Sequence, residues 1–399
     1  MHVLVIPSWY PTEDAPTQGI YFQEQVQMLR RDGLRMGVVY PEQRSLRRLS
    51  WGRLRDHHFQ RTQQREAGVP TLRFHGWNVW WRHPAGVRFR IREAARLAER
   101  YIERHGVPDV IHAHSARWAG AAAARIGQRF SIPYVLTEHF SGLLRGDVFP
   151  SRQPFFREGF RDACGVAAVS TALRDALVTD GVVTDGGASK TDIDVHPNPV
   201  DPAVFAPPVT APPEDPFRFL TVTRLDGRKG TATLLRAFAH AFPAPLSVHL
   251  NVVGDGPQKT KLRALCQELD LTGRVSFRGV LQREAVRHAY QAAHAFVLAS
   301  RQETFGVVLI EALATGLPVV STRCGGPEDI VVPEVGLLVP VEDTAALADA
   351  LQVLHRRCST YDAARIRRYA VERFGPEPFC RRTRSFYRRA CQGGGTSVA

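Results

Sequence analysis

Short apolar runs alternate with helical patterns along almost the whole sequence, and this alternation limits the fold more than any other feature. It begins with the apolar run Val3–Ile6 and a helical pattern that ends near Arg31, and it continues through Asp109–His114 and Pro133–His139. Alternating strands and helices favour parallel sheets built from right-handed β-α-β units. We therefore predict an α/β fold whose ligands bind beyond the carboxyl ends of the strands.

The alternation starts again after a proline-rich segment. Its prolines are Pro197, Pro199, Pro202, Pro207, Pro208, Pro212, Pro213 and Pro216. Proline stiffens a linker, and 399 residues are enough for two cores, so we place a domain boundary here. We predict two Rossmann-like doubly wound domains, residues 1–200 and 201–375, with an interdomain cleft for a ligand. Residues 376–399 are predicted to form a basic helix that crosses back to the first domain and ends in a disordered tail.

The expected strands are short in both halves. In the first half they are Val3–Ile6, Met36–Tyr40, Asp109–His114, Pro133–His139, Cys164–Ser170 and Ile193–His196. In the second half they are Phe217–Thr223, Leu246–Val253, Val275–Phe277, Ala295–Leu298, Pro318–Ser321 and Gly336–Val339. Helical patterns separate them, including Val87–Arg104, Thr231–Phe242 and Gln258–Leu269.

The chain is basic, with 52 Lys and Arg against 39 Asp and Glu and a net charge of +13. Such a charge favours acidic partners: phosphate-bearing ligands, nucleic acid or an anionic membrane surface. The basic residues are scattered and no nucleic-acid-binding module is recognised, so we expect no nucleic-acid partner.

The segment from Arg44 to Arg65 mixes arginines with leucines and Trp51. This composition is typical of a helix at a membrane surface, while a solvated helix packed on its own domain is the alternative. Three tryptophans follow, and we interpret them either as a core cluster or as a wall of an acceptor site: Trp77, Trp80 and Trp81.

No feature of the sequence indicates secretion or membrane insertion. The apolar start is too short for a signal peptide, and no run of about 18 apolar residues occurs. The six cysteines are widely spread, with neither a Cys-x-x-Cys pair nor the spacing of zinc ligands. We expect a reduced, cytoplasmic protein, with peripheral contact at the inner face of the membrane left open.

Two carboxylates flank a glycine in the stretch from Ser300 to Val320. Glu303 lies in a loop, Gly306 near the start of a helix, and Glu311 about two turns into that helix. The backbone N–H groups at a helix start bind anions. Eight helical residues would separate the glutamates by about 12 Å, more than the roughly 5 to 9.5 Å between the carboxyl groups of glycosidases. We therefore expect Glu303 and Glu311 to hold different parts of one long ligand.

Two cations follow the first strand of the second half. Arg224 and Lys229 suit a diphosphate, since arginine offers paired donors and lysine a movable charge. An ordinary solvated loop is the alternative. The glycine pairs Gly254-Asp-Gly256 and Gly325-Gly326 would let a ligand approach the backbone.

Histidines lie at the ends of two strands in the first half. His114 and His139 are expected at the ligand-binding edge of the sheet. We expect His112 and His114 to project from opposite faces of their strand, and likewise Asp192 and Asp194, so that neither pair binds a metal. No metal and no cofactor are predicted.

Several motifs together resemble the retaining glycosyltransferases of family 4, over nearly the whole chain. The matching motifs are Arg224-Leu-x-x-x-Lys229-Gly230, Val253-Gly-Asp-Gly-Pro257, Glu303-x-Phe-Gly-x-x-x-x-Glu311-Ala with Gly316-x-Pro-Val, Gly19 after the first strand, Thr137-Glu-His139, and Pro197-Asn-Pro-Val-Asp201-x-x-x-Phe205. The last motif departs from the family's usual Pro-Asn-Gly-Val-Asp at Pro199. The resemblance implies the GT-B architecture of two Rossmann-like domains.

The resemblance also implies roles for particular residues. Arg224 and Lys229 would bind the donor diphosphate, Glu311 the ribose and Glu303 the transferred sugar. His139 would lie near the sugar and the acceptor, where it orients or polarises without acting as a base. Other donor contacts would come from Gly19, Gly254, Val280, Phe305, Gly306 and Val307, with the segment around Val280 facing the base.

The expected activity is retaining, metal-independent transfer of a sugar from a nucleotide-diphosphate sugar, foremost a UDP-sugar, to a hydroxyl acceptor. Bacterial polysaccharide or glycolipid biosynthesis is the expected setting, with a lipid-linked glycan among the acceptors. The alternatives are glycosylation of a small natural product, a sugar-nucleotide epimerase or phosphorylase, and a non-enzymatic binder of nucleic acid or membrane surfaces. The sugar and the acceptor are not predicted.

Overall fold

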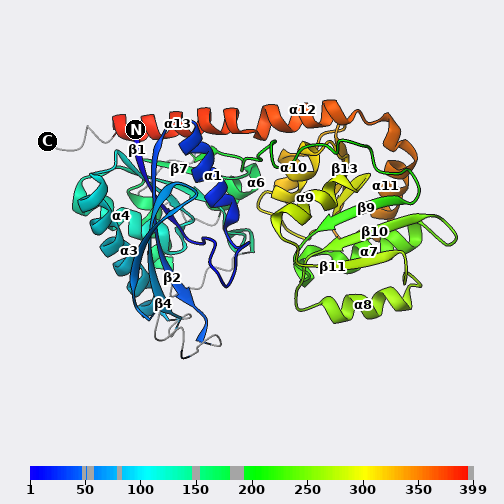
Figure 1. The fold of residues 1–399 in the computed structure, drawn as a ribbon, viewed down its shortest axis with the longest axis horizontal. Coiled ribbons are helices and arrows are strands. Elements are labelled where there is room, and N and C mark those ends of the chain that lie inside the picture. The colour runs from blue at the N-terminus through cyan, green and yellow to red at the C-terminus, as the bar shows by residue number, and fades with distance from the viewer. Residues whose placement is uncertain (47–50, 52–57, 79–82, 146–152, 180–192, 394–399) are drawn as a thin grey trace. The chain divides into compact units, whose positions relative to one another are not determined.

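The computed structural model describes residues 1–46, 51, 58–78, 83–145, 153–179 and 193–393 (Figure 1). The chain divides into two compact units. Unit 1 comprises Met1–His196 and Phe379–Ala399, and unit 2 comprises Pro197–Pro378. Each unit is built on one largely parallel sheet, which confirms the predicted α/β class.

Among its described residues, unit 1 has a sheet of eight strands in the order β3-β4-β2-β1-β5-β6-β7-β8. The strands are β1 (His2–Pro7), β2 (Arg35–Arg44), β3 (Arg61–Glu66), β4 (Val69–Trp77), β5 (Val110–His114), β6 (Tyr134–Glu138), β7 (Gly165–Ala168) and β8 (Ile193–Val195). Only β3 runs antiparallel to its neighbour. The carboxyl ends of β1, β5 and β6 therefore meet at one edge.

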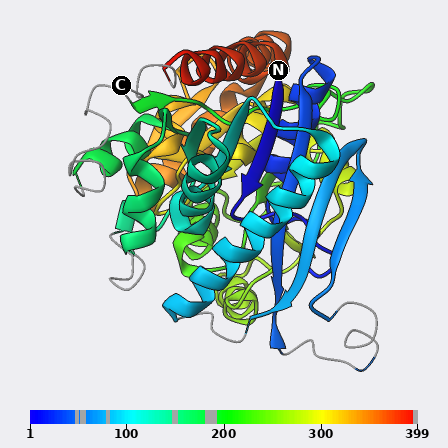
Figure 2. The ribbon, with the colours of Figure 1, turned by 90° about the vertical axis from the view of Figure 1, so that its left-hand side faces the viewer.

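Helices cover both faces of this sheet. The described helices are α1 (Ile20–Arg31), α3 (Pro84–His105), α4 (Ala121–Phe130), α5 (Gln153–Arg161), α6 (Thr171–Thr179) and α13 (Pro376–Gly393). Val3 and Val5 point into a core shared with α1 and α13. On the other face Gly37 of β2 leaves space for Tyr101 of α3, because a Cβ at Gly37 would lie 2.1 Å from its hydroxyl oxygen. Figure 2 shows α3 in cyan in front of the blue strands of this sheet.

The C-terminal helix α13 is part of the core of unit 1. Phe379, Phe386 and Tyr387 are buried there. The Tyr387 hydroxyl lies 2.7 Å from Nδ1 of His112 in β5, which joins segments 275 residues apart. Deleting this helix would therefore expose a large apolar surface of unit 1.

The prediction of a helix through Arg65 is wrong, because Arg61–Glu66 forms strand β3, paired with β4. This edge strand is polar and half exposed, so it lacks the apolar run that marks a buried strand. Residues 47–50 and 52–57 of the segment lie outside the described residues; Trp51 is 89% exposed. Trp77 is buried and its indole N–H donates to His58 Nδ1 at 2.9 Å, whereas Trp80 and Trp81 lie outside the described residues.

The sheet of unit 2 has six strands in the order β11-β10-β9-β12-β13-β14, all parallel. The strands are β9 (Phe217–Val222), β10 (Val248–Val253), β11 (Val275–Gly279), β12 (Ala295–Leu298), β13 (Val319–Thr322) and β14 (Gly336–Val339). The helices are α7 (Thr231–Ala241), α8 (Lys259–Glu268), α9 (Arg283–Gln291), α10 (Val307–Ala314), α11 (Thr344–Arg357) and α12 (Ala363–Phe374). Chain order reverses between β9 and β12, the kind of point at which doubly wound sheets bind ligands.

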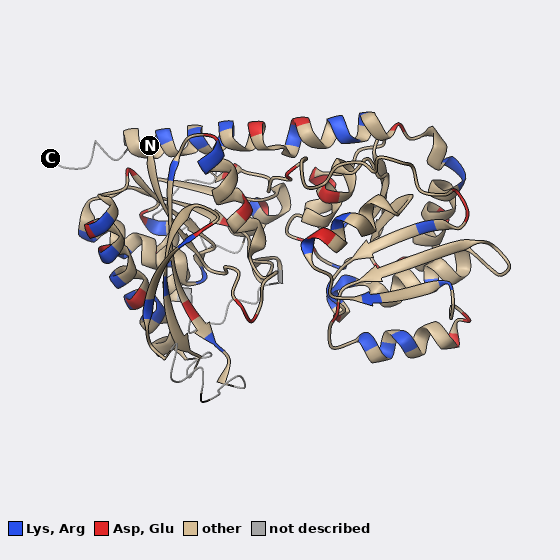
Figure 3. Cartoon of the chain, viewed as in Figure 1, with Lys and Arg blue, Asp and Glu red and all other residues tan. Residues whose placement is uncertain are grey.

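Lysine and arginine are spread over helices of both units, including α8, α12 and α13 (Figure 3). Within the residues that the structure describes, no helix has the length and apolar character needed to cross a membrane.

Candidate functional site

The loops after β9, β12 and β13 touch one another at the carboxyl edge of unit 2. The backbone N–H of Arg301 donates to the carbonyl of Arg228 at 2.8 Å, and that of Glu303 to Cys324 at 3.0 Å. A Cβ at Gly326 would lie 2.2 Å from Cα of Phe305, so only glycine fits there. The predicted residues of these loops are therefore brought together by close backbone packing.

Lys229 and Glu303 form an ion pair at this edge. Nζ of Lys229 lies 2.6 Å from Oε1 of Glu303, which also accepts the Ser300 hydroxyl at 2.7 Å. The two charged side chains are 26% and 12% exposed. The lysine and the glutamate that the sequence assigns to diphosphate and sugar are thus direct neighbours, which suits adjacent groups of one ligand.

Arg224 is positioned differently from Lys229. Its side chain is 69% exposed, and its Nε lies 3.6 Å from Oδ2 of Asp226. Asp226 caps the short 3₁₀ helix Gly227–Lys229 through the backbone N–H of Arg228. Burial raises the pKa of this carboxyl, but hydrogen bonds and charge from Arg228 outweigh it and leave the pKa lowered. Asp226 is thereby kept ionised and holds the loop that carries both predicted cations.

Gly306 precedes helix α10 in a left-handed conformation, with φ of 102°. This conformation is strained for any residue with a side chain. The first backbone N–H groups of the helix, from Val307 onward, point away from the helix body and carry its positive dipole end. Phe305, by contrast, is buried, and its ring centroid lies 5.9 Å from that of Phe374. Only the backbone here is suited to contact a ligand.

Glu311 is held by two residues that the sequence reasoning missed. Its Oε1 lies 2.8 Å from Nη1 of Arg283, and its Oε2 accepts the Tyr290 hydroxyl at 3.0 Å. Burial, with the charge of Glu311, raises the pKa of Tyr290, so this phenol stays protonated and donates. A carboxylate has about four acceptor positions, so two hydrogen bonds orient Glu311 without exhausting it. Arg283 is the first residue of α9, and no motif of the sequence marked it.

The other residues of unit 2 to which the resemblance gives a donor contact, Gly254 and Val280, lie near the ends of β10 and β11. The N–H of Gly254 donates to the carbonyl of Gly279 at 2.8 Å, which joins the two strand-end loops. Val280 follows directly, and its side chain is 65% exposed. An exposed valine beside a glycine-lined loop is a surface on which a flat ring can lie.

In unit 1, Gly19 begins helix α1 and packs on the loop after β1. A Cβ at Gly19 would lie 2.8 Å from the carbonyl carbon and oxygen of Trp9. Its φ of 73° also excludes most other residues. Gly19 therefore places the start of α1 against the carboxyl end of β1.

The expectation that His112 and His114 project from opposite faces of β5 is wrong. Their ring centroids lie 4.0 Å apart, because residues i and i+2 of a strand share a face. His112 contacts Thr137 and Tyr387, while His114 Nδ1 lies 3.1 Å from His139 Nε2. Asp192 lies outside the described residues, and Asp194 pairs with His196 at 3.6 Å.

The buried carboxylate of Glu138 joins the ends of β5 and β6. Its oxygens accept the backbone N–H groups of Ala116 at 2.7 Å, His139 at 2.8 Å and Phe140 at 2.7 Å. Burial raises the pKa of Glu138, although these N–H donors oppose that shift. Glu138 thus fixes the backbone that carries His139. The Thr137-Glu-His139 motif contains it, but the sequence did not indicate its role.

His139 is a neutral imidazole at pH 7. Burial, with a contribution from His112, lowers its pKa to about 3. Among the described residues its Nδ1 has no hydrogen-bond partner, while its ring packs against Phe22 at 4.8 Å between centroids. A neutral ring is poorly suited to act as a base at pH 7, and its unpaired Nδ1 is buried in this structure.

The lowered pKa values of His112, His114 and His139 predict that the folded state is less stable in acid. The pKa of His139 is lower in the folded chain than its ordinary 6.5, so below pH 6.5 the unfolded chain takes up a proton that the folded chain does not. The contribution of His139 to the free energy of unfolding is therefore fully present above pH 6.5 and is lost as the pH falls toward 3. Between pH 7 and pH 5 this loss is about 2 kcal/mol. Burial lowers the pKa values of His112 and His114 as well.

Urea unfolding midpoints at pH 7 and pH 5 measure this loss. The variant His139→Gln should show a smaller decrease than the wild type. An equal decrease in both proteins would show that His139 does not contribute.

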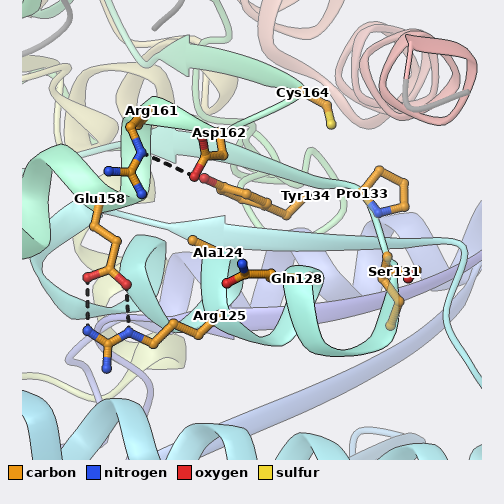
Figure 4. A pocket seen from close by; sticks show the side chains of 12 residues that line it. Ala124, Arg125, Gln128, Ser131, Pro133, Tyr134, Glu158, Arg161, Asp162 and Cys164 are labelled. Atoms are coloured by element: carbon orange, nitrogen blue, oxygen red, sulfur yellow. Dashed lines mark hydrogen bonds and ion pairs between the residues drawn. The ribbon is translucent and has the colours of Figure 1, made fainter. Parts of the chain in front are cut away.

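A cavity of about 510 Å³ in unit 1 lies away from these residues, at the amino ends of β6 and β7 (Figure 4). Arg125 and Glu158 pair across it at 2.6 Å, and Arg161 pairs with the adjacent Asp162. Its charged groups thus neutralise one another, and none of the predicted site residues lines it. The candidate site is the carboxyl edge of each sheet.

Two family matches span residues 18–371. Residues 18–204 match the family described as Glycosyltransferase Family 4, and residues 205–371 match the family described as Glycosyl transferases group 1. One match ends and the other begins within the proline-rich segment, so each covers most of one α/β half.

Individual proteins agree with these matches. The chain is 29% identical over 366 residues to the glycosyltransferase TuaC of Bacillus subtilis, whose name assigns it to teichuronic acid biosynthesis, with 88% of each chain covered. Among solved structures it is similar to sucrose-phosphate synthase from Thermosynechococcus elongatus, with a TM-score of 0.77, 23% identity and 98% and 99% of the two chains covered. HepE of Anabaena, in complex with UDP and glucose, gives a TM-score of 0.72 at 20% identity, with 96% and 98% covered.

Proposed function

This chain belongs to the GT-B glycosyltransferases of family 4 and group 1, and we propose that it moves a sugar from a UDP-sugar to a hydroxyl acceptor with retention of configuration and without a metal ion. The observation that carries the proposal is the pairing of both predicted glutamates with cations at one edge of unit 2. Glu303 pairs with Lys229, and Glu311 pairs with Arg283. Sugar and ribose hydroxyls would approach carboxylates that are already oriented.

Lys229 and the start of α10 supply the positive charge for the leaving group. When the bond from the anomeric carbon to the diphosphate breaks, negative charge grows on the phosphate oxygens. Lys229 is placed to share its charge between that phosphate and Glu303, and Arg224 is exposed enough to add a second donor. The backbone N–H groups after Gly306 complete this set. Fixed positive charge of this kind supports departure of the diphosphate without a metal.

Retention follows in this proposal from attack on the same face that the diphosphate leaves. The acceptor oxygen forms the new bond to the anomeric carbon while its proton passes to the departing phosphate oxygen. No protein base is required for this transfer. The lowered pKa of His139 fits that scheme, because the neutral ring serves to orient a hydroxyl by hydrogen bonding.

The base and the biological setting are supported by the relatives. Val280 offers an exposed apolar contact for a base, and HepE was solved with UDP. TuaC is named for teichuronic acid biosynthesis, so we place this chain in the synthesis of a bacterial polysaccharide or glycolipid. A lipid-linked glycan acceptor would place the protein in the cytoplasm, where the exposed residues Leu46 and Trp51 would contact the membrane surface.

A nucleotide screen tests the donor assignment. UDP at about 100 times its dissociation constant stabilises the folded state by about 2.7 kcal/mol, which for a unit of this size raises the unfolding temperature by about 5 °C or more. GDP and ADP at equal concentration should raise it less. No response to UDP up to several millimolar would contradict the donor assignment.

Turnover experiments test the reaction itself. Turnover of the best UDP-sugar should be unchanged by EDTA, and the anomeric signal of the product in proton NMR should match that of the donor. Loss of turnover on chelation, or inversion at the anomeric carbon, would contradict the corresponding part of the proposal.

A further inference from the structure

Ser300 is a fully buried serine whose hydroxyl contacts a predicted site residue. It lies two residues after the end of β12, and its side chain is 0% exposed. The hydroxyl donates to Oε1 of Glu303 at 2.7 Å. Buried hydroxyls in proteins are mostly hydrogen-bonded, but the acceptor here is the carboxylate that the proposed function assigns to the transferred sugar. The contact therefore serves either the fold or the site.

The two carboxylate oxygens of Glu303 have different surroundings. Oε1 accepts hydrogen bonds from Nζ of Lys229, at 2.6 Å, and from the Ser300 hydroxyl. Oε2 accepts none from the described residues and is not a buried atom. A carboxylate oxygen has about two acceptor positions, so the protein fills Oε1 and leaves Oε2 for a ligand.

The backbone on both sides of this contact is already fixed. The N–H of Glu303 donates to the carbonyl of Cys324 at 3.0 Å, and the carbonyl of Glu303 accepts the N–H of Gly326 at 2.9 Å. The carbonyl of Ser300 accepts the hydroxyl of Thr322 in β13. Only the side-chain torsions of Glu303 remain to be set, and the hydrogen bonds to its carboxylate set them.

Lys229 is a poor sole support for Glu303 once a donor is bound. Lysine carries a point charge on a flexible stem, and in the proposed reaction the diphosphate attracts that charge as well. Ser300 has no charge, and its fully buried side chain is out of reach of a ligand. Its hydrogen bond to Oε1 therefore persists when Lys229 turns toward the phosphate.

We propose that Ser300 is a positioning residue for Glu303: its hydroxyl holds Oε1, so that Oε2 accepts hydrogen bonds from the transferred sugar. The inference rests on the proposed function, because it places Glu303 at the sugar. Ser300 itself touches no substrate. It contributes to binding and turnover of the whole nucleotide sugar and not to the affinity for the nucleotide alone.

Replacing Ser300 by alanine tests this role. In Ser300→Ala, kcat/KM for the UDP-sugar should fall about tenfold or more, the effect of losing a hydrogen bond to a charged group, while the affinity for UDP should not change. Ser300→Cys should lie between Ser300→Ala and the wild type, since a thiol is a weaker donor. Ser321→Ala is the matched control: Ser321 is also 0% exposed, and its hydroxyl lies 3.5 Å from the carbonyl of Thr322, so both constants should stay unchanged.

A double-mutant cycle with Glu303→Ala separates positioning from a structural role. The measured quantity is the affinity for the UDP-sugar relative to that for UDP, from titration calorimetry, which requires no turnover. If Ser300 acts through Glu303, Ser300→Ala lowers this ratio in the wild-type background and has no further effect in Glu303→Ala. An equal decrease in both backgrounds, or no decrease in the wild type, would overturn the inference.

Two further results would overturn it: wild-type kcat/KM in Ser300→Ala, or a loss of UDP affinity as large as the loss of UDP-sugar affinity. Thermal unfolding with and without UDP shows whether each variant is folded, and Ser300→Cys, which keeps the volume of the side chain, replaces the alanine variant if that one does not fold. A wild type that neither responds to UDP nor turns over a UDP-sugar would contradict the proposed function. Normal wild-type turnover with an unaffected Ser300 variant would contradict only the role of Ser300.

Discussion

Replacing Lys229 by alanine is expected to lower kcat by about 10²- to 10³-fold, the usual cost of removing one charged donor aimed at a developing anion. The charge on the leaving diphosphate is larger in the transition state than in bound donor, so kcat should fall more than KM rises. The fold should persist. Glu303 loses one partner but keeps the hydroxyl of Ser300, at a partly exposed position.

Steady-state kinetics with the best UDP-sugar measure this effect, with circular dichroism as the check on folding. Lys261→Ala is the matched control, because Lys261 is exposed on α8 and has no assigned role. Turnover by Lys229→Ala within about threefold of the wild type would remove Lys229 from the leaving-group site.

Replacing Glu311 by glutamine is expected to raise the KM for the donor about 10- to 100-fold, the cost of one lost hydrogen bond to a charged acceptor. Glutamine keeps the shape of the side chain, but it has one carbonyl oxygen where the ribose hydroxyls need a carboxylate. Arg283 also loses its ion pair at 2.8 Å, so the amide is held less firmly. The change should appear mainly in donor binding, since the ribose is remote from the reacting carbon.

Titration of UDP into the variant separates binding from chemistry. Glu284→Gln is the matched control, because Glu284 lies on α9 beside Arg283, pairs with Arg287 and is 67% exposed. Its UDP affinity should equal that of the wild type. If Glu311→Gln also binds UDP with wild-type affinity, the ribose assignment is wrong.

Most of the fold is predictable from the sequence because a buried parallel strand is a continuous apolar run. Ala295–Leu298 and Gly336–Val339 have the predicted bounds, and the other predicted strands differ by a few residues. The failures in unit 1 are β4, which was not predicted although it is buried, and β3. Strand β3 is an exposed edge strand without apolar residues, and its pairing with β4 depends on the neighbouring strand rather than on its own composition.

The candidate site was likewise only partly predictable from the sequence. Lys229, Glu303 and Glu311 are indicated by residue type and spacing, since loops after parallel strands share one edge of a sheet. Arg283 and Tyr290 are not, because each acts through Glu311, more than 20 residues away in the sequence. Glu138 is not, because its role depends on the backbone N–H groups that the fold places around its carboxylate.

The sequence by itself determined the α/β class, the repeated halves and the strand ends at which charged residues collect, because these depend on local periodicity and on the order of elements. Only the tertiary structure decided which charges pair across the loops, such as Lys229 with Glu303. Such contacts join loops from different strands. Their geometry depends on strand order and backbone packing, which composition and spacing do not contain.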